Sequence, residues 1–318
     1  MKDKWARNIE YLRISITDRC NLRCFYCMPD EGIQKLSHGD ILSFEQLYLI
    51  VQAAVELGIK KVRITGGEPL VRLGVIEFIS KISKLSGLTD IAMTTNGILL
   101  EKYAQKLKQA GLHRLNISLD SLREERYRQI TRRGELQQVL KGIEAAERVG
   151  LSPIKINTVI MRGINDDEIE DFARLSQVKP YQIRFIELMP MGEAELIEDK
   201  RFISNEEIIE KIPELIPMVK GNDPGPAKYY QLLGAKGKLG FISPMSNHFC
   251  KTCNRIRLTA DGKLKPCLHS NFEIDIKDAT KIQDIKRLLK KAILSKPERH
   301  HLNEGSESSI RSMNQIGG

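Results

Sequence analysis

The sequence lacks the long apolar segments that secretion and membrane insertion require. Its N-terminus reads Met-Lys-Asp-Lys-Trp, and no run approaches the roughly 20 apolar residues of a transmembrane helix. We therefore expect a soluble protein of the cytoplasm, without a membrane partner.

The sequence also lacks a concentrated basic segment. Its net charge of +9 favours an anionic partner, which could be nucleic acid, an acidic membrane surface or a phosphorylated small molecule. However, there is no long Lys/Arg block and no set of aromatic platforms of the kind on which nucleic-acid bases stack. We expect no nucleic-acid partner.

No cysteine stands outside two groups of three, which are Cys20/Cys24/Cys27 and Cys250/Cys253/Cys267. A chain of 318 residues can bury a core without disulfides, so these thiols are expected to act as ligands. The first group packs three thiols into eight residues. Soft thiolates suit an iron-sulfur cluster, and three ligands on a four-iron cluster leave one iron open. A structural zinc site requires four ligands, usually as two pairs, so iron-sulfur is favoured here.

The spacing Cys20-x3-Cys24-x2-Cys27, with Tyr26 before the last cysteine, resembles the cluster loop of the radical S-adenosylmethionine (SAM) superfamily. The resemblance implies a 4Fe-4S cluster whose open iron chelates the amino and carboxylate groups of SAM. Reduction then cleaves SAM to a 5′-deoxyadenosyl radical, which abstracts hydrogen from the substrate.

Strand and helix patterns alternate six times in the first two hundred residues. A capping box of Ser43 and Gln46 begins one helix, and Gly111 and Gly150 stand where two others should end. Such alternation predicts parallel strands with right-handed crossovers, and six units predict an α/β fold built as a partial (β/α)6 barrel. The expected strands are 11–17, 61–65, 90–95, 114–120, 154–160 and 182–188.

These strands alternate apolar and polar residues, so the two faces of the sheet should have different surroundings. The apolar face should pack on helices, while the polar face lines an interior with the cations Arg13, Lys61, Arg63, Lys155 and Arg184. Burying so many cations favours a large anionic substrate, because unpaired charges are costly to bury. The alternative interpretation is a sheet with one face in water, which needs no ligand, and the pattern does not exclude it.

Thr65-Gly66-Gly67-Glu68-Pro69 follows the second strand, where barrel sites are built. It resembles the superfamily segment that binds the amino group of SAM. By the same resemblance Gly67, Ser118, Met189 and Tyr26 would contact the cofactor.

A loop-forming segment, Gly221 to Pro226, suggests a division into a barrel domain, 1–220, and a smaller C-terminal α+β domain, 221–318. Strands are expected at 227–232 and 239–243, a hairpin at Asp261-Gly262, and a helix at 282–294. A two-residue turn there would pair Leu258 with Lys265 and Ile256 with Cys267, bringing Cys267 beside Cys250 and Cys253. These three cysteines with His269 could equally be four zinc ligands.

The two cysteine triplets, the basic residues near the second and the ending Met313-Asn314-Gln315-Ile316-Gly317-Gly318 together resemble the GTP 3′,8-cyclase family of molybdenum cofactor biosynthesis. The resemblance implies conversion of GTP to (8S)-3′,8-cyclo-7,8-dihydroguanosine 5′-triphosphate after the 5′-deoxyadenosyl radical abstracts hydrogen from C3′. It also implies a second 4Fe-4S cluster on Cys250, Cys253 and Cys267, which would bind guanine. The expected GTP contacts are Arg13, Lys61, Arg63, Thr94, Lys155, Arg184, Arg255, Ile256 and Arg257.

The same resemblance implies catalytic roles for Arg255, Arg257, Gly317 and Gly318, the last two on a tail that reaches the site. The expected partners are GTP, an external electron donor and the downstream cyclic pyranopterin monophosphate synthase. The sequence does not decide whether the protein forms a homodimer. Two rivals remain on sequence alone. One is a peptide-modifying radical SAM enzyme, and the other is a zinc-stabilised nucleic-acid-binding protein.

Overall fold

The computed structural model describes residues 1–318 except 35, 38, 198, 220–224, 301–310 and 318. Its centre is one curved sheet in the order β12-β11-β10-β1-β2-β3-β4-β5-β6-β9-β8-β7. The strands are β1 (Tyr11–Ser15), β2 (Lys61–Thr65), β3 (Asp90–Thr95), β4 (Arg114–Ser118), β5 (Ile154–Ile160), β6 (Gln182–Glu187), β7 (Ile216–Pro217), β8 (Lys228–Gln231), β9 (Lys238–Ile242), β10 (Arg255–Leu258), β11 (Lys263–Lys265) and β12 (Ile274–Asp275).

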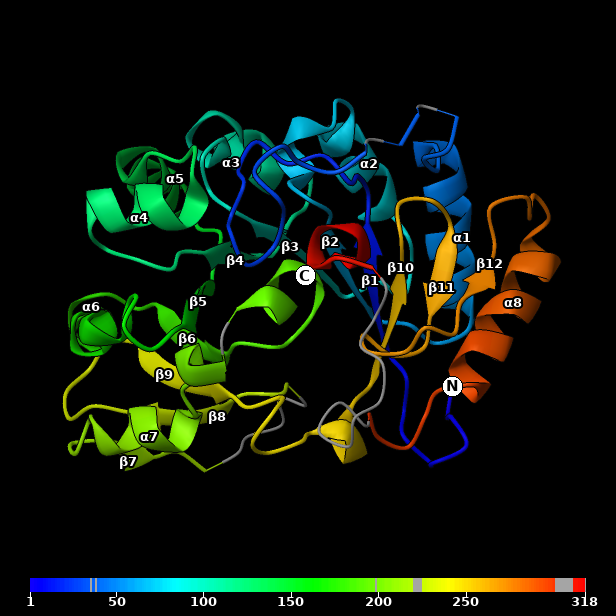
Figure 1. Ribbon diagram of the computed structural model, residues 1–318. Coiled ribbons are helices and arrows are strands. Elements are labelled where there is room, and N and C mark those ends of the chain that lie inside the picture. The colour runs from blue at the N-terminus through cyan, green and yellow to red at the C-terminus, as the bar shows by residue number, and fades with distance from the viewer. Residues whose placement is uncertain (35, 38, 198, 220–224, 301–310, 318) are drawn as a thin grey trace.

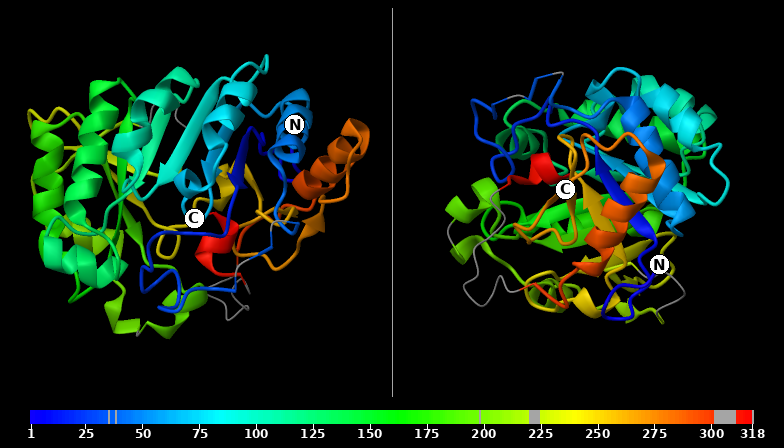
Figure 2. Two further views of the ribbon diagram at one scale, coloured as in Figure 1. Left: turned by 90° about the horizontal axis from the view of Figure 1, so that it is seen from above. Right: turned by 90° about the vertical axis from the view of Figure 1, so that its right-hand side faces the viewer.

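Helices cover the outer side of this sheet, and the inner side is left for the C-terminal helix α9 (Figures 1 and 2). The helices are α1 (Phe44–Glu56), α2 (Val75–Ile82), α3 (Leu100–Gln109), α4 (Glu124–Thr131), α5 (Leu136–Arg148), α6 (Ile169–Val178), α7 (Asn205–Glu210), α8 (Ile282–Leu294) and α9 (Met313–Ile316). Among the described residues, no helix combines the length and the apolar composition needed to cross a membrane.

The local sequence signals explain where the helices begin and end. Ser43 accepts a hydrogen bond from the Gln46 backbone and the Gln46 side chain accepts one in return, which completes the expected capping box of α1. Gly111 and Gly150 follow α3 and α5 with φ values of 95° and 70°, a conformation that side chains with a Cβ resist. The helix expected at 282–294 has those bounds.

The six strands β1 to β6 pair in parallel, which confirms the partial (β/α)6 barrel. The C-terminal part extends this sheet on both sides, because β10 pairs in parallel with β1 and β9 with β6. The division suggested at 220 stays a prediction, and its loop lies partly outside the described residues. Strands β1, β4 and β6 end one or two residues earlier than expected.

The apolar strand face packs under the helices as expected. Leu12, Ile14, Val62 and Ile64 have no exposed surface and belong to the main hydrophobic core. Period-two alternation then turns the polar residues between them to the opposite side of the sheet. The core thereby fixes which residues face the interior.

The register predicted for the hairpin at Asp261-Gly262 is wrong by one residue. Leu258 pairs with Leu264 and Arg257 with Lys265. The turn has three residues, since the Thr259 backbone N–H donates to the Lys263 carbonyl at 2.9 Å and Gly262 takes the left-handed conformation at φ 83°. Asp-Gly fits both turn lengths, and the chain uses the longer one.

Candidate active site

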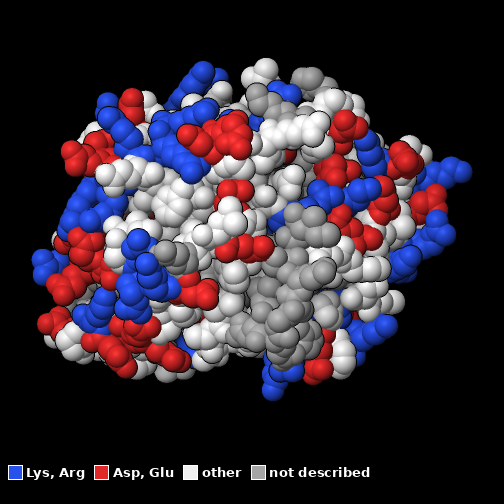
Figure 3. All heavy atoms as spheres, viewed as in Figure 1, with Lys and Arg blue, Asp and Glu red and all other residues white. Residues whose placement is uncertain are grey.

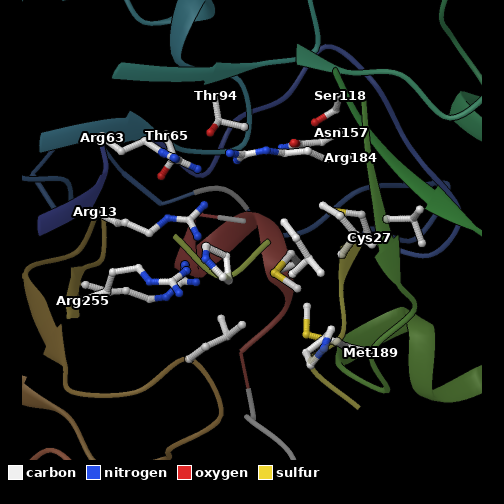
Figure 4. Close-up of a pocket in the computed structure, with 18 of the residues that line it drawn as sticks. Arg13, Cys27, Arg63, Thr65, Thr94, Ser118, Asn157, Arg184, Met189 and Arg255 are labelled. Carbon is white, nitrogen blue, oxygen red and sulfur yellow. The ribbon is translucent and has the colours of Figure 1, made fainter. Parts of the chain in front are cut away.

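The inner face of the sheet encloses a cavity of about 370 Å³. Figure 4 shows Arg13, Arg63 and Arg255 extending into it from one side, with Cys27 and Met189 on the other. The described lining includes all six cysteines and most residues expected from sequence, namely Arg13, Tyr26, Lys61, Arg63, Gly67, Thr94, Ser118, Lys155, Arg184, Met189, Arg255 and Arg257.

Three expected site residues, Ile256, Gly317 and Gly318, are not among the described residues that line this cavity. The Ile256 side chain has no exposed surface and lies in the hydrophobic core, because it alternates with Arg255 and Arg257 along β10. Gly317 lies beside the cavity, as described below, and Gly318 lies outside the described residues.

The first cysteine set lies in a loop that follows the carboxyl end of β1. The Leu22 N–H donates to Cys20 Sγ at 3.4 Å, and Asn96 Nδ2 lies 3.9 Å from the same sulfur. Asn96 Nδ2 also donates to Asn21 Oδ1 at 2.8 Å. The loop is therefore held from the end of β3 as well as from its own backbone.

The buried Glu68 carboxylate connects the glycine turn after β2 to this loop. It accepts hydrogen bonds from the Thr95 hydroxyl at 2.8 Å, the Asn96 N–H at 2.7 Å and the Leu70 N–H at 3.1 Å. Burial raises the pKa of Glu68 to about 7, although these donors oppose the shift. Glu68 thus orients Asn96, which contacts Cys20.

The two glycines before Glu68 are required by the cysteine loop itself. A Cβ at Gly67 would lie 2.4 Å from the Arg19 carbonyl oxygen, and one at Gly66 would lie 2.7 Å from that of Thr17. The Gly67 N–H donates to Thr17 O at 2.7 Å. These contacts give the Gly-Gly pair a packing role, and cofactor binding by Gly67 stays a prediction.

Carboxylates and thiols dominate the surroundings of the first set. The Tyr26 hydroxyl donates to Asp120 at 2.6 Å, and burial raises the pKa of Asp120 to about 6. Desolvation raises the pKa of Cys20 to about 11 and that of Cys27 to about 12, with neighbouring thiols and carboxylates adding to the shift. Protein groups alone do not stabilise thiolates here.

The second cysteine set lies among cations. Lys296 Nζ donates to the Arg255 carbonyl at 2.8 Å and to that of Pro266 at 2.9 Å, which joins the chain after α8 to the segments carrying the cysteines. Although burial opposes it, the positive charges of Arg255 and Lys296 lower the pKa of Cys253 to about 6. The protein itself therefore favours a thiolate at Cys253.

The cavity wall carries a large excess of positive charge. Its described lining includes nine Lys or Arg residues, which are Arg13, Lys61, Arg63, Arg114, Lys155, Arg184, Arg255, Arg257 and Lys296, but one carboxylate, Asp120. Burial lowers the pKa of Arg63 and of Arg257 to about 10, and repulsion between neighbouring guanidinium groups adds to this effect. Such a wall favours a polyanion.

The C-terminal tail enters the same region, and α9 lies on the inner side of the sheet (Figure 1). Arg257 Nη1 donates to the Gly317 carbonyl at 2.6 Å, and Asn314 Nδ2 donates to Asp18 O at 3.3 Å. The Asn314 backbone also hydrogen-bonds Cys27 and lowers its pKa, against the larger effect of burial. The tail thus contacts both the first cysteine loop and the arginine strand beside the second set.

Gly317 fits its position because it has no side chain. Its φ is 76°, and a Cβ there would lie 2.1 Å from Thr65 Oγ1. Upstream, Arg311 anchors the tail by ion pairs with Asp261 at 2.8 Å and Glu273 at 2.7 Å. This agrees with the expectation that the tail reaches the site.

Each set of three thiols supplies the soft donors that an iron-sulfur cluster takes. All six are free and line one cavity. Among the described residues, no three His, Cys, Asp or Glu side chains converge on a position for a single metal ion. The first set follows the carboxyl end of β1. In the second set, Cys250 and Cys253 precede the amino end of β10, the parallel partner of β1, and Cys267 follows β11, which is antiparallel to β10. The two sets therefore lie beyond opposite ends of β1.

Sequence reasoning missed Tyr11, Arg114, Lys296 and Asn314, all of which line the cavity. The first two could have been found by extending the period-two alternation back from Arg13 and from Asn116. Lys296 and Asn314 reach the site through tertiary contacts that the sequence does not indicate.

Two family models match the chain, the radical SAM superfamily over residues 14–176 and Molybdenum Cofactor Synthesis C over residues 181–302. The GTP 3′,8-cyclase of Alkaliphilus oremlandii is 58% identical over the full length of both chains, and that of Alkaliphilus metalliredigens is 56% identical, also over both full lengths. This chain belongs to the GTP 3′,8-cyclase family. Because this family belongs to the radical SAM superfamily, membership implies one 4Fe-4S cluster and SAM binding.

Solved structures support the family's fold at lower identity. Streptococcus suis SuiB, bound to its precursor peptide SuiA, has a TM-score of 0.65 at 13% identity, with 96% of this chain and 74% of SuiB covered. Histidine-tagged anSMEcpe with bound AdoMet has a TM-score of 0.60 at 14% identity, with 92% and 79% covered. These likenesses show the radical SAM fold alone.

Proposed function

We propose that this protein is a radical SAM enzyme that converts GTP to (8S)-3′,8-cyclo-7,8-dihydroguanosine 5′-triphosphate, the first step of molybdenum cofactor biosynthesis. The observation that carries the proposal is one cavity that joins six free thiols to nine cations. Relatives of more than 50% identity over full length carry the name of this activity. A nucleoside triphosphate supplies the negative charge that the wall favours.

Cys20, Cys24 and Cys27 would hold the first 4Fe-4S cluster, with Tyr26, Gly67, Ser118 and Met189 on the SAM side. When bound, this cluster and SAM would supply the 5′-deoxyadenosyl radical that takes hydrogen from C3′ of the ribose. Closing the C3′–C8 bond would leave an unpaired electron on the guanine, so one electron from the external donor and one proton would complete the dihydro product. The hydrogen bond from the Tyr26 hydroxyl to Asp120 ties the cysteine loop to the chain after β4.

Cys250, Cys253 and Cys267 would hold a second 4Fe-4S cluster that binds the guanine. The alternative is a zinc ion with His269 as the fourth ligand, as in common Cys3His sites. Soft thiolate ligands suit either metal, and the family resemblance favours the cluster. Iron and zinc content of anaerobically purified protein separates the two.

The protein's own residues position the substrate. The cations on β1, β2, β5 and β6, among them Arg13, Arg63 and Lys155, neutralise the triphosphate, and Thr94 supplies a hydroxyl beside them. Arg257 holds the Gly317 carbonyl, so the tail covers the inner face of the sheet at Thr65. Excluding water and fixing the ribose would confine the radical to one hydrogen, because small misplacements cost large factors in rate.

In a cell, the enzyme would use an external electron donor in the cytoplasm and pass the cyclised triphosphate to cyclic pyranopterin monophosphate synthase. The direct test is an anaerobic assay with reconstituted protein, GTP, SAM and a strong reductant. We expect the cyclised triphosphate together with 5′-deoxyadenosine. Reconstituted protein that cleaves SAM but leaves GTP unchanged would contradict the proposal.

A further inference from the structure

Tyr11 is a buried cavity residue that the function proposed above does not use. It begins β1 on the same face as Arg13, lines the cavity and is 9% exposed. Its hydroxyl proton has no acceptor in the part of the chain that the structure describes, and the polar group beside the oxygen is the Arg114 guanidinium, itself a donor. A buried O–H without an acceptor costs stability, whereas phenylalanine would fill the same space without that cost.

The groups around this phenol are cationic and come from several strands. The Arg63 guanidinium on β2 lies 5.4 Å from the Tyr11 ring centroid. The charges of Arg63, Arg114, Arg13 and Arg255 lower the pKa of Tyr11, although burial opposes the shift. An oxygen placed within this group of guanidiniums is therefore strongly favoured if it is negatively charged.

Arg114 is fixed in this group by a carboxylate on the neighbouring strand. Its Nε donates to Asp90 Oδ1 at 2.9 Å, and its Nη2 pairs with Asp90 Oδ2 at 2.5 Å. Both side chains of the pair are largely buried. The ion pair uses one edge of the guanidinium and orients the group beside Tyr11, in a fork geometry suited to phosphate.

A tyrosine at this position supplies a hydrogen-bond donor without adding to the repulsion between the cations. The pKa of Arg13 is lowered by burial and by repulsion from Arg257 and Arg63, so a further cation would add to that repulsion. A phenol adds a hydrogen-bond donor without adding positive charge. The acceptor that its position lacks is an anionic oxygen from a ligand.

We propose that the Tyr11 hydroxyl donates a hydrogen bond to a phosphate oxygen of the bound nucleotide, in a subsite shared with Arg63 and Arg114. The proposal rests on the function proposed above, because it takes a nucleoside triphosphate as the substrate. It assigns Tyr11 to substrate binding, where its hydroxyl distinguishes phosphorylated from unphosphorylated ligands.

The test compares wild-type protein with Tyr11→Phe, both reconstituted anaerobically, by calorimetry with GTP, guanosine and inorganic triphosphate. We expect Tyr11→Phe to weaken GTP and triphosphate binding by about ten- to a hundredfold, as for other hydrogen bonds to charged groups. Guanosine binding should not change, because the lost bond is to phosphate.

Tyr127→Phe is a matched control. Tyr127 is 1% exposed and its hydroxyl likewise has no partner among the described residues, but it does not line the cavity. This variant should bind all three ligands as the wild type does. Equal GTP and triphosphate affinity in Tyr11→Phe and wild type, or an equal loss for guanosine, would overturn the assignment.

The ligand set separates this proposal from the proposed function. Wild-type protein that binds triphosphate as tightly as GTP and does not bind guanosine would argue against the cyclase, while a triphosphate loss confined to Tyr11→Phe would still support the subsite. Conversely, GTP turnover with unchanged ligand affinities in Tyr11→Phe would keep the cyclase and remove the subsite.

Discussion

The two cysteine sets supply the same number of thiols in opposite electrostatic surroundings. The first lies near Glu68 and Asp120, and desolvation raises the pKa of its thiols, that of Cys20 to about 11. The second lies near Arg255 and Lys296, which lower the pKa of Cys253 to about 6 against the effect of burial. Carboxylates thus lie near the first set, whereas cations near the second set lower the pKa of Cys253, although burial raises that of Cys250.

This difference indicates a division of labour. Negative surroundings favour the oxidised form of a bound iron-sulfur cluster, and so lower its reduction potential, whereas positive surroundings raise it. A low potential would suit the reductive cleavage of SAM that is proposed for the first set. The cations near the second set suit an anionic nucleotide. The following predictions test this division, beginning with the largest expected effect.

Removing one thiol from each set should have different consequences. We expect Cys24→Ala to abolish SAM cleavage, because the first cluster is lost. Cys253→Ala should retain some cleavage but form no cyclised product, since the SAM side of the barrel is intact. Anaerobic assays of 5′-deoxyadenosine and product measure both. Cyclised product from a Cys253→Ala protein that is shown to lack the second cluster would contradict the different roles of the two sets.

The C-terminal tail contacts both the first cysteine loop and the arginine strand beside the second set, since Asn314 contacts Cys27 and Arg257 holds Gly317. Deleting Gly317 and Gly318 should leave both clusters and SAM binding intact while cyclisation falls by at least about a hundredfold. Iron content, SAM calorimetry and product formation check this, and a synthetic peptide of the last residues should restore part of the activity. Full activity after truncation would show that the tail is dispensable.

The cations of the wall should bind the triphosphate. Arg63→Ala or Lys155→Ala should weaken GTP binding by about ten- to a hundredfold, because each loses a charge-assisted hydrogen bond. Arg174→Ala is the matched control, since Arg174 on α6 pairs with Glu170 on the surface. Anaerobic calorimetry measures the affinities. If both cavity variants bind GTP like the control, the cations serve another purpose.

Glu68, near the first cysteine set, should make the free energy of unfolding depend on pH. Its folded pKa of about 7 lies above the unfolded value of about 4.3, so the folded state binds the extra proton between these values. The free energy of unfolding should therefore fall by up to roughly 3 kcal/mol as pH rises from about 4.5 to about 8, and Glu68→Gln should remove this fall. Denaturant unfolding at several pH values checks it, with the exposed Glu101→Gln as control. An unchanged pH profile in Glu68→Gln would mean that its carboxyl is solvated.

Local patterns in the sequence predict a large part of this site. Period-two alternation places Arg13, Arg63 and Lys155 on the inner face, because the apolar residues between them must pack under helices. The same alternation, extended by one step, reaches Tyr11 and Arg114. Surface charge is less informative, since Lys and Arg are mixed with Asp and Glu over the face in Figure 3.

Contacts between distant segments are what the sequence does not give. Nothing local in β10 indicates that it pairs with β1, and the polar tail does not suggest that Ile316 is fully buried. The close approach of Gly67 to Arg19 likewise depends on the folded loop. The hairpin prediction at Gly262 was wrong because two turn lengths suit the same dipeptide.

The most direct test of the account follows one hydrogen atom. Reconstituted protein would be supplied with SAM, a strong reductant and GTP that carries deuterium at C3′, and the 5′-deoxyadenosine would be analysed by mass spectrometry. We expect one deuterium in the 5′-deoxyadenosine and none at C3′ of the cyclised triphosphate. Unlabelled 5′-deoxyadenosine, with the deuterium still on intact GTP, would contradict the claim that this cavity cyclises GTP.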